Sequence, residues 1–172
     1  TDRIEMNSDV ENYIAQMGEL KIETSNEYDD VLINKVIDFE KKNTPTAIDN
    51  RKVITSRTIA VNKKSIDIFV WDNMKVDGDQ ISLMMNGNWI LKKHTLSESK
   101  YKLNIKIDPH SNNYLVLYAH NLGTQPPNTA ALRFHDGTKQ RELLLKSDLG
   151  ECGAINFVYM NDNGITGYNS SK

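Results

Sequence analysis

The spacing of hydrophobic residues changes near residue 51. Before that point apolar side chains recur every three or four residues, and after it they alternate with polar ones. The first period is typical of an amphipathic helix, and the second of a strand with one buried face. The change predicts a helical segment over residues 1–50 docked on a β-sandwich domain over residues 51–160. The Gly, Asn and Ser content of residues 161–172 predicts a flexible tail.

Two short helices are predicted in residues 1–50. Ser8 and Glu11 have the spacing of a capping box at the start of the first helix. The second helix has acidic residues in its first turn and lysines in its last turn, which complement the helix dipole. Its apolar side chains form a stripe on one face over residues 28–39, so we expect this helix to pack on the sandwich.

Roughly eight or nine short strands are predicted after residue 51. The clearest segments are 66–71, 81–85, 89–91, 101–107, 114–119, 130–134, 141–145 and 155–159. Asn86-Gly87 and Asp136-Gly137 are strong hairpin signals between them. Residues 114–119 are almost wholly apolar, which is typical of a central strand covered on both faces. The pattern predicts a mainly β chain that forms an antiparallel β-sandwich of immunoglobulin-like or jelly-roll order.

Composition and charge limit the classes of partner. A chain of 172 residues with 38% hydrophobic and 26% charged residues suits one domain, or one domain with an appendage, and supports a packed core. The net charge of -2 offers no basic surface for nucleic acid. No apolar stretch approaches the ~18 residues of a membrane span, so we expect no membrane span. A single cysteine, Cys152, excludes an internal disulfide and any zinc site built on cysteines.

An acidic loop between two predicted strands is the first candidate site. Asp72, Asn73, Asp77 and Asp79 lie within eight residues, and Gly78 permits a tight bend. Calcium takes six to eight oxygen ligands from carboxylates, amides and main-chain carbonyls, so these four residues are candidate calcium ligands. The alternative is that Asp and Asn cap turns through hydrogen bonds to the nearby backbone, with Asp77-Gly78 forming a β-turn.

Two tryptophans are the second candidate site. Trp71 lies on the strand face opposite the apolar residues of its own strand, and Trp89 follows the Asn86-Gly87 turn. Exposed aromatic rings on a sandwich can stack on sugars, which makes Trp71 and Trp89 candidate glycan-binding residues. The alternative is that they cover the core, as large aromatics beside tight turns commonly do.

The sequence shows none of the common catalytic patterns. The four histidines, His94, His110, His120 and His135, lack the spacing that places two imidazoles on one metal ion. There is no G-x-S-x-G motif for a nucleophilic serine and no glycine-rich phosphate loop. Cys152 has no basic neighbour in sequence to lower its pKa, so we expect it to be a small buried apolar residue. We therefore expect no catalytic residues and no enzyme activity.

Four motifs follow one another in a specific order. They are DNxxxDGDxISLxxNGxWIL over residues 72–91, NNYLVLYAxNLG over 112–123, PPNTA over 126–130 and LxSDL over 145–149. Together they resemble an uncharacterised β-sandwich module of exported and surface-attached bacterial proteins, over about residues 51–159. The resemblance implies an extracytoplasmic location, whether periplasmic, outer-surface or secreted, and no assigned activity. His120 departs from the pattern, in which an acidic residue usually precedes Asn121-Leu122-Gly123.

The functional expectation combines these inferences. We expect a non-catalytic binding or scaffolding module of a bacterial cell-surface or secreted protein, with a protein partner at the cell envelope. A carbohydrate-binding accessory domain is the alternative, and an enzyme of unknown class comes third.

Overall fold

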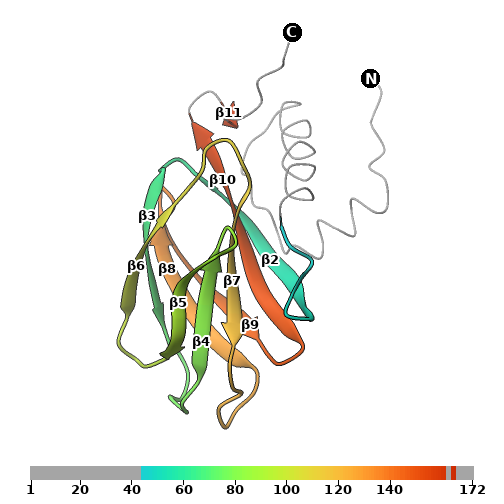
Figure 1. Ribbon diagram of the computed structural model, residues 1–172. Helices are drawn as coiled ribbons and strands as arrows, with labels where there is room; N and C mark the ends of the chain where they lie inside the picture. Colours follow the sequence, from blue (N-terminus) through green and yellow to red (C-terminus); the bar gives the residue numbers. More distant parts are fainter. Residues whose placement is uncertain (1–43, 162–163, 166–172) are drawn as a thin grey trace, which may run out of the picture.

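The computed structural model describes residues 44–161 and 164–165, which form strands and the loops between them (Figure 1). The two helices predicted in the first 43 residues lie outside the described residues. The described part contains no helix and two β-sheets, which confirms the prediction of a mainly β chain. Within this part, no helix is long and apolar enough to cross a membrane.

The larger sheet has seven strands. Six follow the order β1–β2–β10–β7–β4–β5, and β11 pairs with β10. These strands are β1 (Ala47–Ile48), β2 (Arg51–Val61), β4 (Gln80–Met85), β5 (Asn88–Thr95), β7 (Asn113–Ala119), β10 (Glu151–Asn161) and β11 (Gly164–Ile165). The two residues of β11 fall inside the tail that was predicted to be flexible.

The smaller sheet has four strands in the order β6–β3–β8–β9. They are β3 (Ser65–Trp71), β6 (Tyr101–Lys106), β8 (Asn128–His135) and β9 (Gln140–Ser147). All pairs within it are antiparallel. The two sheets face each other across a shared hydrophobic core, so the described residues form a β-sandwich-like fold (Figure 1).

One strand pair departs from the antiparallel prediction. β2 and β10 pair in parallel, with a register shift between Ala154 and Ile155. Parallel neighbours cannot be joined by a tight hairpin and need a long crossover connection. Here most of the described chain lies between the two strands, so their pairing leaves no signal in the local sequence.

The core between the sheets is built from alternating residues of both sheets. Its fully buried members include Ile68, Leu83, Leu115, Leu132 and Phe157. Alternation along each strand places these side chains on the inner faces.

A second apolar cluster lies on the outer face of the larger sheet. We call it the outer cluster, and its buried members are Met84, Val116, Cys152 and Ala154. Partly buried residues pack against it: Ile48, Val53, Trp89, Tyr114 and Tyr118. β7 is therefore apolar on both faces, as predicted for a central strand, and Cys152 is fully buried, as predicted.

The turns follow the predicted glycine positions. Asn86 and Gly87 connect β4 to β5 and have φ values of 49° and 81°. An Asn-Gly hairpin turn requires this left-handed conformation at both residues. Asp136 and Gly137 begin the connection between β8 and β9. Both hairpin predictions are confirmed.

Three connections meet at one end of the sandwich, at the bottom of Figure 1. They are residues 72–79 between β3 and β4, 120–127 between β7 and β8, and 148–150 between β9 and β10. We call this region the loop end. All three connections join a strand of one sheet to a strand of the other.

Candidate functional site

The acidic loop begins and ends where the sequence predicts. β3 ends at Trp71 and β4 begins at Gln80, so residues 72–79 carry the chain from the smaller sheet to the larger one. Hydrogen bonds fix the backbone at both ends, since the Asp72 N–H donates to the Ser97 carbonyl at 2.8 Å and the Leu96 N–H donates to the Asp79 carbonyl at 2.8 Å. The carboxylates therefore lie on a restrained backbone.

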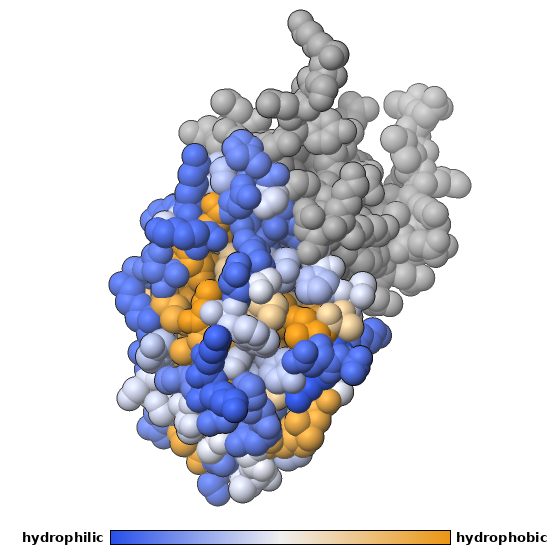
Figure 2. Space-filling view, in the orientation of Figure 1, coloured by the Kyte–Doolittle hydropathy of each residue, from blue (hydrophilic) through white to orange (hydrophobic). Residues whose placement is uncertain are grey.

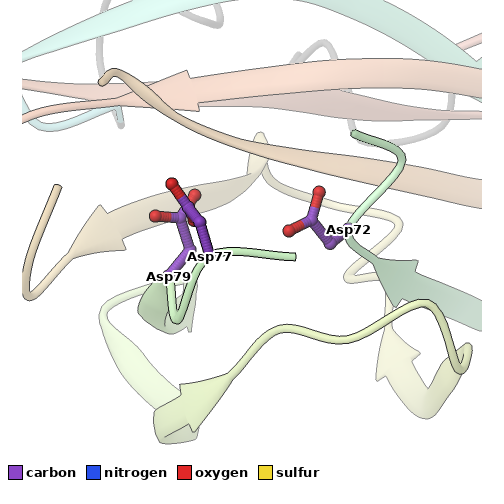
Figure 3. Close-up of side chains that lie close together, drawn as sticks. All are labelled: Asp72, Asp77 and Asp79. Atoms are coloured by element: carbon purple, nitrogen blue, oxygen red, sulfur yellow. The ribbon is translucent and has the colours of Figure 1, made fainter. Parts of the chain in front are cut away.

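Three carboxylates converge in this loop. Asp72, Asp77 and Asp79, which we call the acidic triad, each offer one oxygen, and these oxygens all lie within 4.8 Å of one another. Asp77 and Asp79 lie side by side, and the Asp72 carboxylate faces them from the end of β3 (Figure 3). Asp72 and Asp79 are only 4% and 5% exposed, so the triad holds charge where little water can screen it.

Asp77 joins the triad to the 120–127 connection. Its Oδ2 accepts hydrogen bonds from the Thr124 N–H at 2.6 Å, the Gln125 N–H at 2.8 Å and the Thr124 hydroxyl at 3.1 Å. Burial opposes ionisation, but the Thr124 backbone bond is the strongest influence and holds the pKa of Asp77 below its usual value. Asp77 therefore carries its negative charge at neutral pH.

Asn121 makes a second link between the two connections. Its side-chain amide donates to the Gly78 carbonyl at 2.9 Å, and its side-chain oxygen accepts from the Gln80 N–H at 2.8 Å. These bonds hold the peptide groups on both sides of Asp79. Two segments more than forty residues apart in sequence are thus joined around the triad.

Asp79 is the least satisfied member of the triad. Its Oδ1 is buried and has no hydrogen-bond partner, whereas the Thr129 N–H donates to the same carboxylate. Burial first, then the negative charge of Asp77 and a side-chain hydrogen bond with it, and then the charge of Asp72, raise the pKa of Asp79 to about 6. In the absence of a counter-charge, ionised Asp79 therefore destabilises the fold.

Gly123 brings the backbone of the second connection against these oxygens. Its φ is +53°, and an added Cβ would lie 2.3 Å from Asp79 Oδ1 and 2.4 Å from Asp77 Oδ1. No larger residue fits without displacing the carboxylates. The glycine is therefore part of the wall of the site.

The sequence prediction found only part of this arrangement. Asp72, Asp77 and Asp79 come together as predicted, and Asn73, the fourth predicted ligand, is exposed. Asn128 was not among the predicted ligands. It is fully buried, and its side-chain oxygen has no hydrogen-bond partner. It precedes Thr129, and its side-chain nitrogen lies 3.5 Å from the Asn121 side-chain oxygen.

The hydrogen bonds of the loop support the turn-capping interpretation in part. The Asp72 carboxylate accepts from the Met74 N–H at 2.9 Å, which is the turn-capping bond that the alternative reading predicts. Asp77 also caps backbone amides, but those of a distant segment. Turn capping thus accounts for one oxygen of Asp72 and one of Asp77, and leaves Asp79 Oδ1 without a partner.

The two tryptophans occupy different environments. Trp71 is 8% exposed, with the Lys100 ammonium 4.8 Å and the Arg133 guanidinium 5.4 Å from its ring centroid. Cations at these distances over an indole face are attracted by its quadrupole. Little of the Trp71 ring is left to meet a ligand. Trp89 is half-buried and packs edge-on against Tyr118 at 5.6 Å, on the outer face of the larger sheet.

His120 replaces the acidic residue that the resemblance leads us to expect. Its Nε2 lies 2.6 Å from the Ser82 hydroxyl. Partial burial, followed by the charges of Lys93 and Arg51, lowers the pKa of His120, which favours the neutral imidazole at neutral pH. The described residues give this pair no third group that would turn it into a nucleophilic site.

Comparisons with protein-family models, with curated proteins and with solved structures find no match in any of the three.

Proposed function

We propose that this chain is a non-catalytic binding or scaffolding module of an exported or surface-attached bacterial protein, and that it binds a protein partner through its loop end. The resemblance of residues 51–159 to such modules supports the location. The exposed apolar side chains of the loop end support the binding role.

The observation that carries the proposal is the apolar surface at the loop end. Met74 is 61% exposed, Val76 42% and Leu149 54%. All three lie in connections rather than on strands, and Figure 2 shows apolar patches at this end of the molecule, the lower end of the view. Exposed apolar groups gathered at one end of a domain are typical of a protein-binding surface.

A shallow depression at the loop end includes one of these side chains, Leu149. It is lined by Leu122, Pro126, Pro127, Asp148, Leu149 and Gly150. These residues come from two connections, 120–127 and 148–150, and they are mostly apolar with one carboxylate among them. Such a surface fits an apolar side chain of a partner flanked by a cationic group.

Site-specific photo-crosslinking tests this proposal. A benzophenone amino acid replaces Leu149 at the loop end in one variant and Leu144 in a matched control. Leu144 is 46% exposed on β9, within the smaller sheet. Both variants are incubated with the envelope fraction of the organism that encodes the chain. The proposal expects one protein to be captured from position 149 and not from position 144.

Capture of the same proteins from both positions, or of none from position 149, would contradict the proposal. Leu144 is exposed and apolar like Leu149, so the variant at position 144 measures the non-specific capture that a benzophenone at any exposed apolar position produces.

Carbohydrate binding is the second candidate, and the aromatic group on the outer face of the larger sheet supports it. Trp89 and Tyr118 are both half-buried there, and the Arg51 guanidinium lies 4.0 Å from the Tyr118 ring centroid. A glycan array probed with wild type and Trp89→Ala tests this. Glycan binding that is lost in Trp89→Ala at an unchanged melting temperature would favour this candidate over the first.

We also propose the immunoglobulin-like alternative for the finer fold. Jelly rolls are double sheets built from antiparallel Greek keys. The parallel pairing of β2 with β10 therefore supports the immunoglobulin-like order over the jelly-roll order.

A further inference from the structure

We propose that the acidic triad binds a calcium ion, and that this ion holds the 72–79 and 120–127 connections of the loop end together. This inference goes beyond the proposed binding role and stands on different residues. Three observations lead to it: the spacing of the three carboxylates, the unpartnered oxygen of Asp79, and the absence of a protein cation beside them in the part of the chain that the structure describes.

The spacing of the carboxylates fits the coordination shell of calcium. Calcium binds oxygens at 2.3–2.6 Å, so two ligands on opposite sides of one ion are about 4.6–5.2 Å apart. One oxygen from each carboxylate of the triad lies within 4.8 Å of the others. All three separations therefore lie within the span that oxygens bound to a single calcium ion can have.

The unpartnered oxygen of Asp79 points independently to a ligand. Buried polar atoms in folded proteins nearly always have a partner, and an exception needs an explanation. Asp79 is 95% buried, because its exposed fraction is 5%, and its Oδ1 lies against the second connection at Gly123. The Asn128 side-chain oxygen, also buried and unpartnered, belongs to the same end of the molecule.

Among the described residues, no protein cation forms an ion pair with the triad. The ion pairs among the described residues join Lys102 to Asp67, Arg133 to Glu142 and Arg141 to Asp136, and none reaches the triad. Three carboxylates in a poorly hydrated corner repel one another unless a cation or a proton is bound. A divalent cation removes the repulsion between all three carboxylates, whereas one proton neutralises only one of them.

The burial of the triad favours calcium over magnesium. Magnesium keeps several of its waters when it binds proteins, whereas calcium accepts carboxylate, amide and main-chain oxygens in their place. Asp72 and Asp79 are almost fully buried, which leaves little room for a hydrated ion.

Asp77 is the ligand through which a bound ion would link the two connections. One of its oxygens is held by the backbone of Thr124 and Gln125, so an ion on its other oxygen links that segment to Asp79 and to Asp72 at the end of β3. Calcium is therefore expected to order residues 120–127, of which Leu122, Pro126 and Pro127 line the depression of the proposed partner site.

Thermal unfolding of metal-stripped protein tests the proposal. Wild type, Asp79→Asn and Asp148→Asn are each melted with chelator, with millimolar calcium and with millimolar magnesium. Asp148 is the matched control, because it caps the Gly150 and Glu151 amides at 2.7 Å in the neighbouring turn and lies outside the triad. We expect calcium to raise the melting temperatures of wild type and Asp148→Asn, magnesium to raise them less, and Asp79→Asn to show no shift.

Terbium emission locates the ion. Terbium replaces calcium at oxygen sites and emits when a nearby indole is excited, and Trp71 directly precedes Asp72. We expect terbium emission from wild type that calcium displaces and that Asp79→Asn lacks.

Four outcomes would overturn the proposal. Three are equal melting temperatures of wild type with chelator and with calcium, a calcium shift that survives Asp79→Asn, and terbium emission that calcium does not displace. The fourth is an Asp79→Asn variant that is more stable than wild type in every buffer, which would mean that two carboxylates of the triad share a proton and bind no calcium. The partner-binding proposal is tested separately by crosslinking, so either proposal can fail alone.

Discussion

Asp136 and Asp79 show how the surroundings decide the role of a buried carboxylate. Both are almost fully buried. Burial alone would raise the pKa of Asp136, but hydrogen bonds from the Lys139 N–H, the Thr138 hydroxyl and N–H and the Arg141 guanidinium outweigh it and hold that pKa well below its usual value. Asp79 has fewer donors and two negative neighbours, and its pKa moves the other way. Asp136 therefore stabilises a turn as an anion, whereas Asp79 needs a further partner.

Asp136→Asn is predicted to lower stability in a pH-dependent way. Because the folded-state pKa of Asp136 lies below the unfolded value of about 3.9, its contribution is fully present above that pH and is lost as the pH falls through the folded pKa. The loss at pH 7 should be about 1.5–3 kcal/mol, the value of a hydrogen bond to a charged group. Urea unfolding at pH 7 and pH 3 measures it. A difference between wild type and variant that is the same at both pH values would contradict this account.

Gly123→Ala tests the wall of the acidic site. The added methyl would lie within 2.5 Å of three carboxylate oxygens at a residue whose φ is +53°. The left-handed conformation alone costs about 1–2 kcal/mol, and displacement of the carboxylates adds to it. Thermal melts should show a lower melting temperature and no response to calcium.

Gly150→Ala is the control for this substitution. Its Cβ would meet only Asp148 Oδ1, at 3.5 Å, which is ordinary contact. If the two alanine variants melt alike, the close approach at Gly123 does not constrain the site.

At the scale of the strands, the sequence predicts the positions of those strands that have a clear local pattern of apolar residues. β3, β4, β6 and β7 come within a few residues of their predicted positions, because each is a run of alternating or continuous apolar residues between turn signals. β2 was missed. Its burial alternates imperfectly, with a break in the middle of the strand, and its parallel partner β10 is distant in sequence.

The residues of the candidate site also differ in whether the sequence could predict them. Asp72, Asp77 and Asp79 could be predicted together because the sequence places them in one short loop. The contributions of Asn121 and Gly123 could not be predicted, because they contact this loop only after the two sheets have packed. The sequence contained one usable signal, the polar Asn121-Leu122-Gly123 turn after a buried strand.

Deletion of residues 1–43 tests whether the predicted second helix docks on the sandwich. The outer cluster is the surface we expect its apolar stripe over residues 28–39 to cover. Each large apolar side chain that loses its burial costs about 1.5–3 kcal/mol, so the truncated chain should melt at a clearly lower temperature. An unchanged melting temperature would show that the segment does not stabilise the sandwich and that the docking prediction is wrong.

At the scale of the whole molecule, the strands form a scaffold and the loop end presents two different surfaces. The acidic triad lies inside the connections, and the apolar side chains lie on their outer side. If the partner binds as proposed, this division puts binding on loops held by a rigid scaffold, as in many binding domains. It also separates the effects of substitutions: those in the triad should change stability, and those on the apolar surface should change partner binding.

Leu149→Asp is predicted to abolish partner binding without loss of stability. Leu149 is 54% exposed, so its removal costs the fold little, while a charge in the middle of an apolar contact is unfavourable. Binding of the crosslinked partner to wild type and variant, together with their melting temperatures, measures both effects. A variant that still binds would place the partner surface elsewhere, and one that unfolds would contradict the expectation that Leu149 contributes little to the stability of the fold.

Calorimetric titration of metal-stripped protein with calcium is the most direct test of the calcium site. We expect wild type to bind a single calcium ion per chain and Asp79→Asn, folded under the same conditions, to bind none. We also expect Asp148→Asn to bind calcium as wild type does. No binding to wild type at millimolar calcium, or binding of the same stoichiometry by Asp79→Asn, would contradict the assignment of Asp72, Asp77 and Asp79 as the ion site that organises the loop end.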